Sequence, residues 1–285
     1  MTARIFNGRA LAQDLQNKIA ADVTRLSKQY QTPPNITTVV VGDDPASLLY
    51  LKRRDAACAL VGIHSQHLQF PSDTPEQKVI EAIRRLNDDS STHGILIQYP
   101  LPPQLHPLRL MRTVDPRKDV EGFHPVNLGR TLSGDEDLVP CTPLAVLTIL
   151  SHEAITLKGA DAVIVNHSNI VGKPLAALLI NRDATVTVCH VYTKDLVRYS
   201  SAADILVSGA GVINLITAGH VKSGAAVLDV GTTPTPNGIR GDVTFDEVQN
   251  KASFLTPVPG GVGPVTTVMA LANMVKTFTL TVKSH

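Results

Sequence analysis

Two polar residues in the first third of the sequence are spaced to act together. Tyr50 and Arg54 are four residues apart in a segment with helical periodicity, so they would share one face of a helix. A phenol beside a guanidinium would suit contact with a polar substrate. Taken alone, the pair fits a solvated helix face better.

Further polar residues follow the third apolar run of the chain. Gln98 ends the run GILIQ, and α/β sheets bind ligands at the ends of their strands. An amide that caps the following turn is the alternative. Asp119 and Glu121 lie beside Gly122 in a long loop, and by themselves they are typical of a solvated loop.

Two loops in the second half have the composition of ligand-binding backbone. Residues 166–174 read NHSNIVGKP and separate an apolar run from a helical one. A helix N-terminus at such a place can hold a phosphate, and Gly172 permits close approach of the backbone. The pattern G-x-G-x-x-G is absent, so a plain turn is about as well supported as a dinucleotide site. Residues 256–264, TPVPGGVGP, would line a ligand site or form a rigid connector to the last helix.

Other kinds of site find no support in the sequence. Ten histidines show no H-x-x-x-H pattern, so no metal is expected. The chain has neither a G-x-S-x-G elbow nor a Walker loop. Cys58, Cys141 and Cys189 have mostly apolar or small neighbours, which predicts buried free thiols in a reducing compartment.

The elements that would carry these residues alternate between helix and strand. In the first half, helices are expected at 8–30, 47–60 and 75–87, and strands at 36–41, 64–70 and 94–98. The stretch 100–145 is irregular, and loops of that length are usually functional. In the second half, strands are expected at 160–166, 184–190, 204–210 and 225–231, and helices at 143–152, 174–182, from Thr193 and from 266. This order predicts parallel α/β sheets.

Length and composition set the outer limits. The chain has 285 residues, which suggests about two domains. Its net charge of +1 gives no electrostatic reason to expect nucleic acid or an anionic membrane as a partner. No signal peptide is recognised, and no run approaches the roughly 18 apolar residues of a membrane span. We therefore expect a soluble, cytoplasmic protein with an aliphatic core.

Several stretches of the sequence occur together, in this order, in one known family. They are VGDDPASLLY, GILIQYPLP, KDVEGFHPVNLG, PCTP, NHSNIVGKPLAALL, ATVTVCHVYT and TPVPGGVGPVT, and they cover nearly the whole chain. Together they resemble the methylenetetrahydrofolate dehydrogenase/cyclohydrolase family. The combination of TPVPGGVGP with KDV-x-GF and GIL-x-Q-x-PLP is highly specific.

The resemblance implies an α/β fold of two domains that flank a cleft. Residues 1–140, joined by the C-terminal helix 266–285, would form a folate-binding catalytic domain. Residues 141–265 would form a Rossmann-type, doubly wound parallel sheet that binds NAD or NADP. Such proteins are usually homodimers. The family passes a hydride from methylene-tetrahydrofolate to NAD(P), and water then opens the methenyl product to 10-formyl-tetrahydrofolate.

The family's site residues fall on definite positions of this sequence. The resemblance implies catalytic roles for Tyr50, Arg54, Gln98 and Glu121. It implies substrate contacts at Tyr50, Tyr99, Glu121, Pro259, Gly260, Gly261 and Val262. It implies cofactor contacts at Asn166, His167, Ser168, Val171, Gly172, Val191 and Thr232.

This chain departs from the family pattern at both sites. Arg54 replaces a lysine, and because arginine stays protonated it cannot be a general base. Glu121 replaces an aspartate and reaches one methylene further. In the cofactor loop, Asn166 and His167 stand where Gly-Arg is usual, and Val191 replaces a serine. The usual partners of the NADP 2′-phosphate are thereby missing.

These departures leave three hypotheses open. The first is a methylenetetrahydrofolate dehydrogenase whose cyclohydrolase activity is weakened or absent because of Arg54. The second is a repurposed paralogue that transfers the one-carbon unit of methylene-tetrahydrofolate to another acceptor without NAD(P). The third is a folate-binding protein that is not an enzyme.

Overall fold

The computed structural model describes residues 2–283, apart from the side chains of residues 45, 46, 49, 50 and 53. Contacts within the chain divide it into two compact units. Unit 1 comprises Met1–Gln13, Arg130–Asp135 and Pro140–Met269, and unit 2 comprises Asp14–Gly129, Glu136–Val139 and Ala270–His285. Helices α1 (Gly8–Tyr30), α5 (Pro125–Leu132) and α10 (Val262–Val282) each contribute residues to both units.

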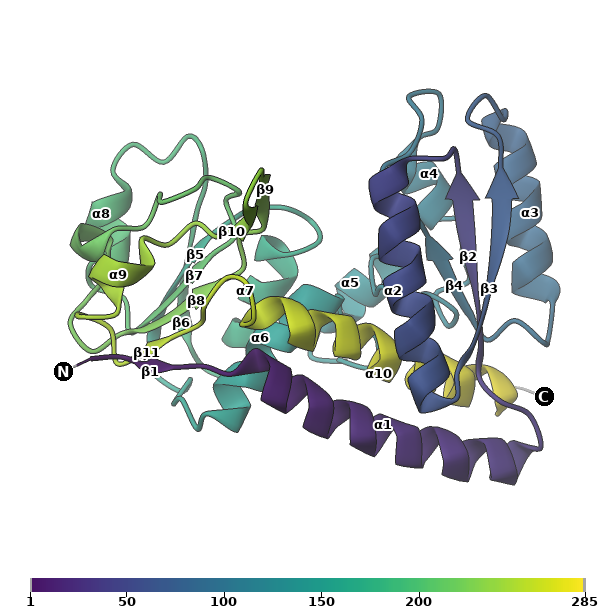
Figure 1. Ribbon diagram of the computed structural model, residues 1–285, viewed down its shortest axis with the longest axis horizontal. Helices are drawn as coiled ribbons and strands as arrows, with labels where there is room; N and C mark the ends of the chain where they lie inside the picture. The colour runs from purple at the N-terminus through teal and green to yellow at the C-terminus, as the bar shows by residue number, and fades with distance from the viewer. Residues whose placement is uncertain (1, 284–285) are drawn as a thin grey trace. The chain divides into compact units, whose positions relative to one another are not determined.

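Unit 2 is built on a small parallel sheet. Its three strands lie in the order β3-β2-β4, and every pairing is parallel. Right-handed crossovers in opposite directions place α2 and α3 on opposite faces, as Figure 1 shows. The elements of this unit are β2 (Asn35–Val41), α2 (Pro45–Val61), β3 (His64–Phe70), α3 (Glu76–Asp88), β4 (Gly94–Ile97) and α4 (Pro107–Met111).

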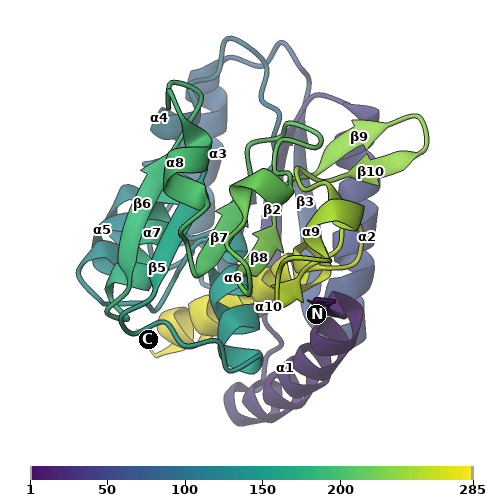
Figure 2. The ribbon, with the colours of Figure 1, turned by 90° about the vertical axis from the view of Figure 1, so that its left-hand side faces the viewer.

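Unit 1 is built on a larger parallel sheet. Its six strands lie in the order β1-β11-β8-β7-β5-β6, so the chain leaves β5 in one direction and returns to its other side at β7. Figure 2 shows β6, β5, β7 and β8 side by side. The elements are β1 (Arg4–Ile5), α6 (Cys141–His152), β5 (Asp161–Val165), α7 (Gly172–Ile180), β6 (Thr185–Cys189), α8 (Leu196–Ser200), β7 (Ile205–Ser208), η1 (Ala218–His220), β8 (Ala226–Asp229), β9 (Thr233–Thr235), β10 (Gly238–Arg240), α9 (Phe245–Val248) and β11 (Phe254–Leu255).

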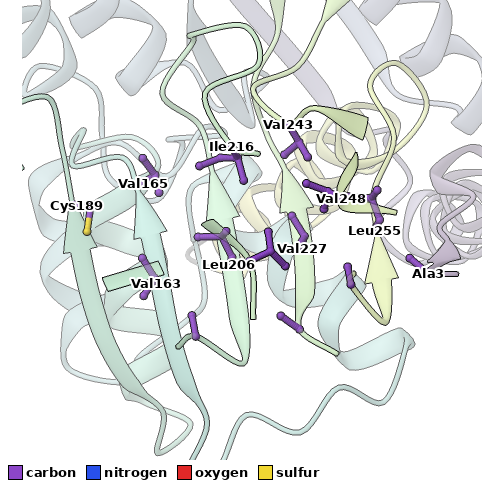
Figure 3. Close-up of a cluster of buried hydrophobic side chains, with 14 residues drawn as sticks. Ala3, Val163, Val165, Cys189, Leu206, Ile216, Val227, Val243, Val248 and Leu255 are labelled. Atoms are coloured by element: carbon purple, nitrogen blue, oxygen red, sulfur yellow. The ribbon is translucent and has the colours of Figure 1, made fainter. Parts of the chain in front are cut away.

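Aliphatic side chains fill the core of each unit. In unit 1, Val163, Leu206 and Val227 from neighbouring strands pack together, and Figure 3 shows them with Cys189 and Leu255. In unit 2, the corresponding cluster packs side chains of β2 and β4 against α3 and α4. Strands β2, β4, β5, β7 and β8 are almost entirely buried, which is why they appear in the sequence as continuous runs of mostly apolar residues, whereas β3 and β6 are largely exposed or half-buried. The predicted α/β class with a Rossmann-type parallel sheet is confirmed.

The helices and strands begin and end close to the residues predicted from the sequence, with a few corrections. Gly62 ends α2 with φ of 79°, as its position predicted. The helix expected from Thr193 begins later, at Leu196, because the side chain of Asp195 accepts a hydrogen bond from the amide of Arg198. The stretch 100–145, expected to be irregular, contains α4 and α5. All three cysteines are buried and free, as predicted.

Helix α10 is more apolar than we expected of any segment. Its most apolar 18-residue window has a mean hydropathy of 1.3, so length and composition alone would allow it to cross a membrane. The expectation that no run approaches a membrane span was therefore wrong by composition. Half of that window is buried inside the protein, and Leu271, Met274 and Phe278 are almost fully buried, as in the core helix of a globular fold.

Candidate active site and cofactor cavity

Helix α2 carries a buried arginine in unit 2. The helix begins at Asp44, whose carboxylate accepts a hydrogen bond of 2.8 Å from the amide of Ser47. Arg54, two turns further on, is only 3% exposed, and its Nη2 donates to Oγ1 of Thr38 on β2 at 2.5 Å. Its Nε and Nη1 atoms are buried without a hydrogen-bond partner among the described residues. A guanidinium with two unused donors is suited to a ligand.

The loop after α4 is held against the sheet by two residues of the KDV motif. Lys118 is buried, and its Nζ donates to the carbonyl oxygens of Leu86, Asn87 and Asp89 at 2.7–2.9 Å. This ammonium group satisfies carbonyls at the C-terminal end of α3, and burial lowers the pKa of Lys118. Its own backbone carbonyl accepts from the amide of Ile95 on β4. The loop therefore runs beside β4.

Asp119 fixes the turn that follows. It is almost fully buried and accepts hydrogen bonds from the amides of Gly122 and His124 and from Nδ2 of Asn127, at 2.8–3.0 Å. These bonds occupy its carboxylate, so its role is to shape the loop. The result is that Glu121 is presented beside the end of β4.

Glu121 carries a carboxyl group in an environment that opposes its charge. The residue as a whole is partly exposed, but its Oε2 atom is buried and has no hydrogen-bond partner among the described residues. Burial and, to a smaller extent, the negative charge of Asp119 raise the pKa of Glu121 to about 8, although the positive charge of Arg54 opposes the rise. The carboxyl is therefore largely protonated at neutral pH.

Gln98 and Tyr99 complete this cluster at the end of β4. Nε2 of Gln98 donates to the carbonyl of Tyr99 at 2.7 Å, which leaves Oε1 buried without a partner in the described part of the chain. Burial, with added repulsion from Glu121 and Asp119, raises the pKa of Tyr99 to about 12, so its phenol stays neutral. Oγ of Ser47 donates to the same carbonyl and ties this loop to the start of α2.

Three of the four residues predicted to be catalytic thus share one feature. Arg54, Gln98 and Glu121 each hold at least one buried polar atom without a partner within the described residues. Native proteins leave few such atoms unsatisfied, and a bound ligand is one explanation for them. The side chain of Tyr50, the fourth predicted residue, lies outside the described residues. We refer to Arg54, Gln98 and Glu121 as the polar cluster.

Unit 1 holds a cavity of about 780 Å³ where three strands end. The walls come from residues 165–169 after β5, from His190–Thr193 after β6 and from Gly209–Val212 after β7. This is the point where the order of strands reverses, and open α/β sheets bind nucleotides there. The volume falls within the range of cofactor sites. The cavity therefore fits a dinucleotide.

Asn166 organises one wall of the cavity. Its Oδ1 accepts from the amides of Ser168 and Gly172 at 2.8 and 3.1 Å, and its Nδ2 donates to the carbonyl of Gly209 at 2.5 Å. The side chain thus joins the ends of β5 and β7. It also accepts hydrogen bonds from amides near the start of α7 that would otherwise be available to a phosphate. A Cβ on Gly172 would lie 1.9 Å from the carbonyl oxygen of Asn166, so only glycine fits there.

Two histidines lie together at the same cavity. The ring centroids of His167 and His190 are 4.8 Å apart, and both residues are exposed and line the cavity. His190 follows β6, which is the strand after β5 in the nucleotide-binding sheet. The end of this second strand is where Rossmann folds distinguish NAD from NADP. Val191 also lines the cavity and is 83% exposed.

The remaining predicted cofactor residues lie off the cavity wall. Val171 precedes α7, and its amide donates to Oγ of Ser168. Thr232 is exposed after β8. Neither residue, nor Gly172, lines the cavity, whereas Asn166, His167, Ser168 and Val191 do.

Two buried aspartates shape the third wall, and sequence reasoning did not single them out. Asp242 accepts hydrogen bonds from Oγ of Ser208 and from the amides of Ala210 and Val212, at 2.6–3.0 Å. Asp229 accepts from three amides in turn, those of Gly231, Asp242 and Val243. Burial raises the pKa of Asp229 to about 6. The signal available in the sequence was the Gly-Ala-Gly run that follows strand β7.

The segment predicted to contact substrate in unit 1 is a tightly packed turn. The carbonyl of Gly260 accepts from the amide of Gly8 at 3.0 Å, and Gly260 has φ of 104°. A Cβ on Gly261 would lie 2.5 Å from the carbonyl oxygen of Pro257. Val262 is buried and begins α10. Glycines are thus required here for packing, whatever else the turn contacts.

The sheet order and the cavity at its reversal define a nucleotide-binding α/β protein, with a second α/β unit that carries the polar cluster. Two family models divide the chain between them. The catalytic domain of tetrahydrofolate dehydrogenase/cyclohydrolase matches residues 6–121, and the NAD(P)-binding domain of the same enzyme matches residues 140–282. The chain belongs to the tetrahydrofolate dehydrogenase/cyclohydrolase family, and the resemblance found in the sequence is confirmed.

Known proteins of this family match the chain over nearly its full length. The chain is 46% identical over 272 residues to the bifunctional protein FolD of Methanosarcina mazei, which covers 95% of each chain. Its fold matches the crystal structure of the bifunctional FolD enzyme, methylenetetrahydrofolate dehydrogenase/cyclohydrolase, of Campylobacter jejuni with a TM-score of 0.95 and 41% identity, over 97% of this chain and 99% of that one. It also matches the Trypanosoma brucei enzyme, complexed with NADP cofactor and inhibitor, with a TM-score of 0.93 and 35% identity over 98% of each chain.

Proposed function

We propose that this chain is an NAD(P)-dependent methylenetetrahydrofolate dehydrogenase of one-carbon folate metabolism and that it retains cyclohydrolase activity. The observation that carries the proposal is the polar cluster, whose unpartnered atoms lie in the unit matched by the family's catalytic domain. Neither the geometry of the described residues nor the relatives favour a repurposed one-carbon transferase or a binding protein without activity.

The polar cluster would bind and polarise the folate. Arg54 offers a permanent positive charge and the N–H groups of Nε and Nη1, which have no partner among the described residues. Gln98 offers an amide oxygen, and Glu121 offers a carboxyl that is neutral at pH 7 and therefore donates as well as accepts. Such a set suits a heterocycle with both donors and acceptors on its edge. We propose that Tyr50, Tyr99 and the turn Pro259–Val262 also contact the substrate.

The cavity of unit 1 would hold the cofactor. NAD(P), when bound, accepts a hydride from the one-carbon bridge of the folate, and the methylene carbon becomes a methenyl cation. The carboxyl end of β5 and the loop 166–169 would carry the pyrophosphate, and His167 and His190 would lie beside the adenosine ribose. We propose that Val171, Gly172 and Thr232 support this loop or the nicotinamide end.

Further features remain proposals of the same kind. The predicted division assigned residues 1–140 with the C-terminal helix 266–285 to the folate domain and 141–265 to the cofactor domain, but β1 lies in the six-stranded sheet of unit 1. We propose that unit 2 forms the folate domain and that unit 1 forms the cofactor domain. We also propose that the protein is a cytoplasmic homodimer. We further propose that it has no nucleic acid or membrane partner, which the near-zero net charge supports. Sedimentation of the purified protein would test the dimer.

A spectrophotometric assay tests the function directly. Methylene-tetrahydrofolate is mixed with the protein and either NAD or NADP, and formation of reduced cofactor is followed. In a second assay, the loss of methenyl-tetrahydrofolate is followed without cofactor and corrected for the rate without protein. We expect turnover in both. The absence of cofactor reduction with either nucleotide would overturn the proposal.

A further inference from the structure

We propose that Asn273 of helix α10 is a positioning residue that sets where Glu121 lies within the polar cluster. The inference rests on the proposed function, since it gives a residue outside the cluster a part in binding the folate. Asn273 is 153 residues from its bonding partner Val120 in the chain, so no local motif connects the two. The fold brings them together within unit 2.

Asn273 joins two loops of unit 2 from inside its core. It is fully buried, and its Nδ2 donates to the carbonyl oxygen of Val120 and to that of Val139, both at 2.9 Å. A side-chain amide nitrogen carries two hydrogens, so both are used here. This nitrogen therefore holds backbone and has no hydrogen left for a ligand.

The bond to Val120 holds the peptide group that leads into Glu121. The carbonyl of Val120 and the N–H of Glu121 belong to the same planar unit. When the bond is lost, this unit can shift, and the side chain of Glu121, which starts at the next Cα atom, shifts with it. Asn273 thus acts on the carboxyl of Glu121 through the backbone.

Strand β4 holds the same stretch less closely. The amide of Ile95 donates to the carbonyl of Lys118 at 2.7 Å, and the amide of Val120 donates to the carbonyl of Ile95 at 3.4 Å. The second of these bonds is long for an N–H···O contact. At 2.9 Å, the bond from Asn273 holds Val120 more closely than the bond to Ile95 does.

A glycine in β4 makes room for this arrangement. A Cβ on Gly94 would lie 2.5 Å from Cγ2 of Val120 and 2.7 Å from Sδ of Met274, the residue after Asn273. Both side chains therefore rest on the backbone of Gly94, and a larger residue there would push them away. Packing at Gly94 and the hydrogen bond from Asn273 thus hold the loop and α10 together at neighbouring points.

The test removes the bond and keeps the carboxyl. Asn273→Leu preserves the approximate size of the side chain but has no N–H donor. Because a displacement of about 1 Å costs up to about 100-fold in rate, we expect kcat/KM for methylene-tetrahydrofolate and for methenyl-tetrahydrofolate to fall about 30-fold. The Kd for tetrahydrofolate should rise, whereas the Kd for NADP should be unchanged because its cavity lies in unit 1.

A matched control lies on the same helix. Thr281→Val removes a buried hydroxyl whose hydrogen bonds, to the carbonyls of Thr277 and Phe278, stay within α10. This variant should match the natural protein in folate binding and in both rates. If Asn273→Leu does not fold by circular dichroism, Asn273→Ser, which keeps one O–H donor, takes its place in every comparison.

A double variant separates positioning from general support of unit 2. Asn273→Leu is combined with Glu121→Ala, and the Kd for tetrahydrofolate is measured by calorimetry, which needs no turnover. If Asn273 acts through Glu121, the double variant should bind no more weakly than Glu121→Ala alone. If the two losses multiply, Asn273 supports the unit in general and the inference fails.

Hydrogen exchange locates the change in the loop. The amide of Val120 should exchange at least about tenfold faster in Asn273→Leu than in the natural protein. The amide of Gln98, which donates to the carbonyl of Val39, should be unchanged, and so should both amides in Thr281→Val.

Two further results would overturn the inference. One is unchanged folate binding and turnover in Asn273→Leu, and the other is unchanged exchange at the amide of Val120. If the natural protein itself neither binds tetrahydrofolate nor turns over either substrate, the proposed function fails instead.

Discussion

Residues 54 and 121 differ from the family pattern in complementary ways. The arginine adds a permanent charge and loses a titrating group, whereas the glutamate keeps its carboxyl and extends it toward the cluster. Because Arg54 is buried and bonded to Thr38, the change at position 54 alters the electrostatics of the site and not only its proton chemistry. The two positions should therefore be tested together.

Lysine at position 54 should raise the rate at which the methenyl compound is hydrolysed, with either carboxylic residue at position 121. In Arg54→Lys and in the double variant Arg54→Lys, Glu121→Asp, burial would lower the pKa of the new ammonium and allow it to exchange a proton. We expect both variants to hydrolyse methenyl-tetrahydrofolate at least about tenfold faster than the natural protein, a part of the roughly 100-fold range of acid–base catalysis. Rates of methenyl-tetrahydrofolate loss measure this. Rates equal to that of the natural protein would contradict it.

His167 should limit the preference for NADP. An arginine there would carry a permanent charge and a fork of donors for a phosphate, which imidazole lacks. We expect His167→Arg to lower KM for NADP about tenfold and to leave KM for NAD nearly unchanged. His64→Arg, which adds the same charge at an exposed site on β3 of unit 2, is the matched control. A parallel fall in both KM values would be inconsistent with a role at the 2′-phosphate.

At the scale of elements, the start of α7 depends on a close fit between helix and strand. Oδ1 of Asn166 bonds the amides of Ser168 and Gly172, and the backbone of Gly172 touches the carbonyl of Asn166. The cavity wall and the helix start are thus one rigid piece. A change that separates them should harm cofactor binding before it harms the sheet.

Gly172→Ala should disturb this piece. The added Cβ would lie 1.9 Å from backbone that cannot move aside cheaply. We expect unit 1 to lose about 3 kcal/mol of stability and NADP to bind more weakly. Gly129→Ala, on the exposed face of α5 with nothing within 4 Å of the added carbon, should be neutral or stabilising by up to about 1 kcal/mol. Urea unfolding and NADP titration measure both, and similar behaviour of the two variants would refute the packing argument.

At the scale of the whole molecule, buried carboxyls make stability depend on pH. Asp229 is nearly buried, and its pKa rises from 3.8 to about 6 in the folded state. Between those values the folded protein binds more protons than the unfolded chain, so the free energy of unfolding falls as pH rises. The contribution of Asp229 to this fall is about 3 kcal/mol.

Two variants isolate that contribution. The difference in unfolding free energy between the natural protein and Asp229→Asn should decrease from pH 4 to pH 7. Asp204→Asn should show the opposite sign in a lower range of pH: a bond from Lys222 lowers the pKa of Asp204 from 3.8, so its contribution is present at neutral pH and is lost as pH falls below about 4. Hydrogen exchange of the amides of β7 and β8 reports the opening of unit 1. The same sign for both variants would contradict these pKa shifts.

The long elements were predictable, and the reasons are visible in the residues. The runs at β2 and β5 are β-branched and buried, and α1 has regular apolar spacing, so each pattern has one interpretation. The short strands β1, β9, β10 and β11 have two or three residues each, too few for any periodicity to show. The pairing of β1 with β11 also joins segments about 250 residues apart, which no local pattern contains, whereas β9 and β10 pair with each other in a short hairpin.

The site was predictable in part for the same reason. Family motifs indicated Arg54, Gln98 and Glu121, and the structure supplies what types and spacing could not, namely burial and unused hydrogen-bonding atoms. The cavity walls after β6 and β7 were incompletely predicted because they depend on the order of strands in the sheet. Asp229 at the end of β8 and Asp242 after β10 were missed because an aspartate at a strand end or in a loop gives no sign of burial in the sequence.

The pairing of β1 with β11 has a consequence for synthesis on the ribosome. Arg4 and Ile5 are made about 250 residues before their partners Phe254 and Leu255. At the elongation rates of roughly 5–20 residues per second, the first strand waits for ten seconds or more without its neighbour. The sheet of unit 1 is therefore completed only after β11 has been made, and β1 must remain available, unpaired, throughout that time.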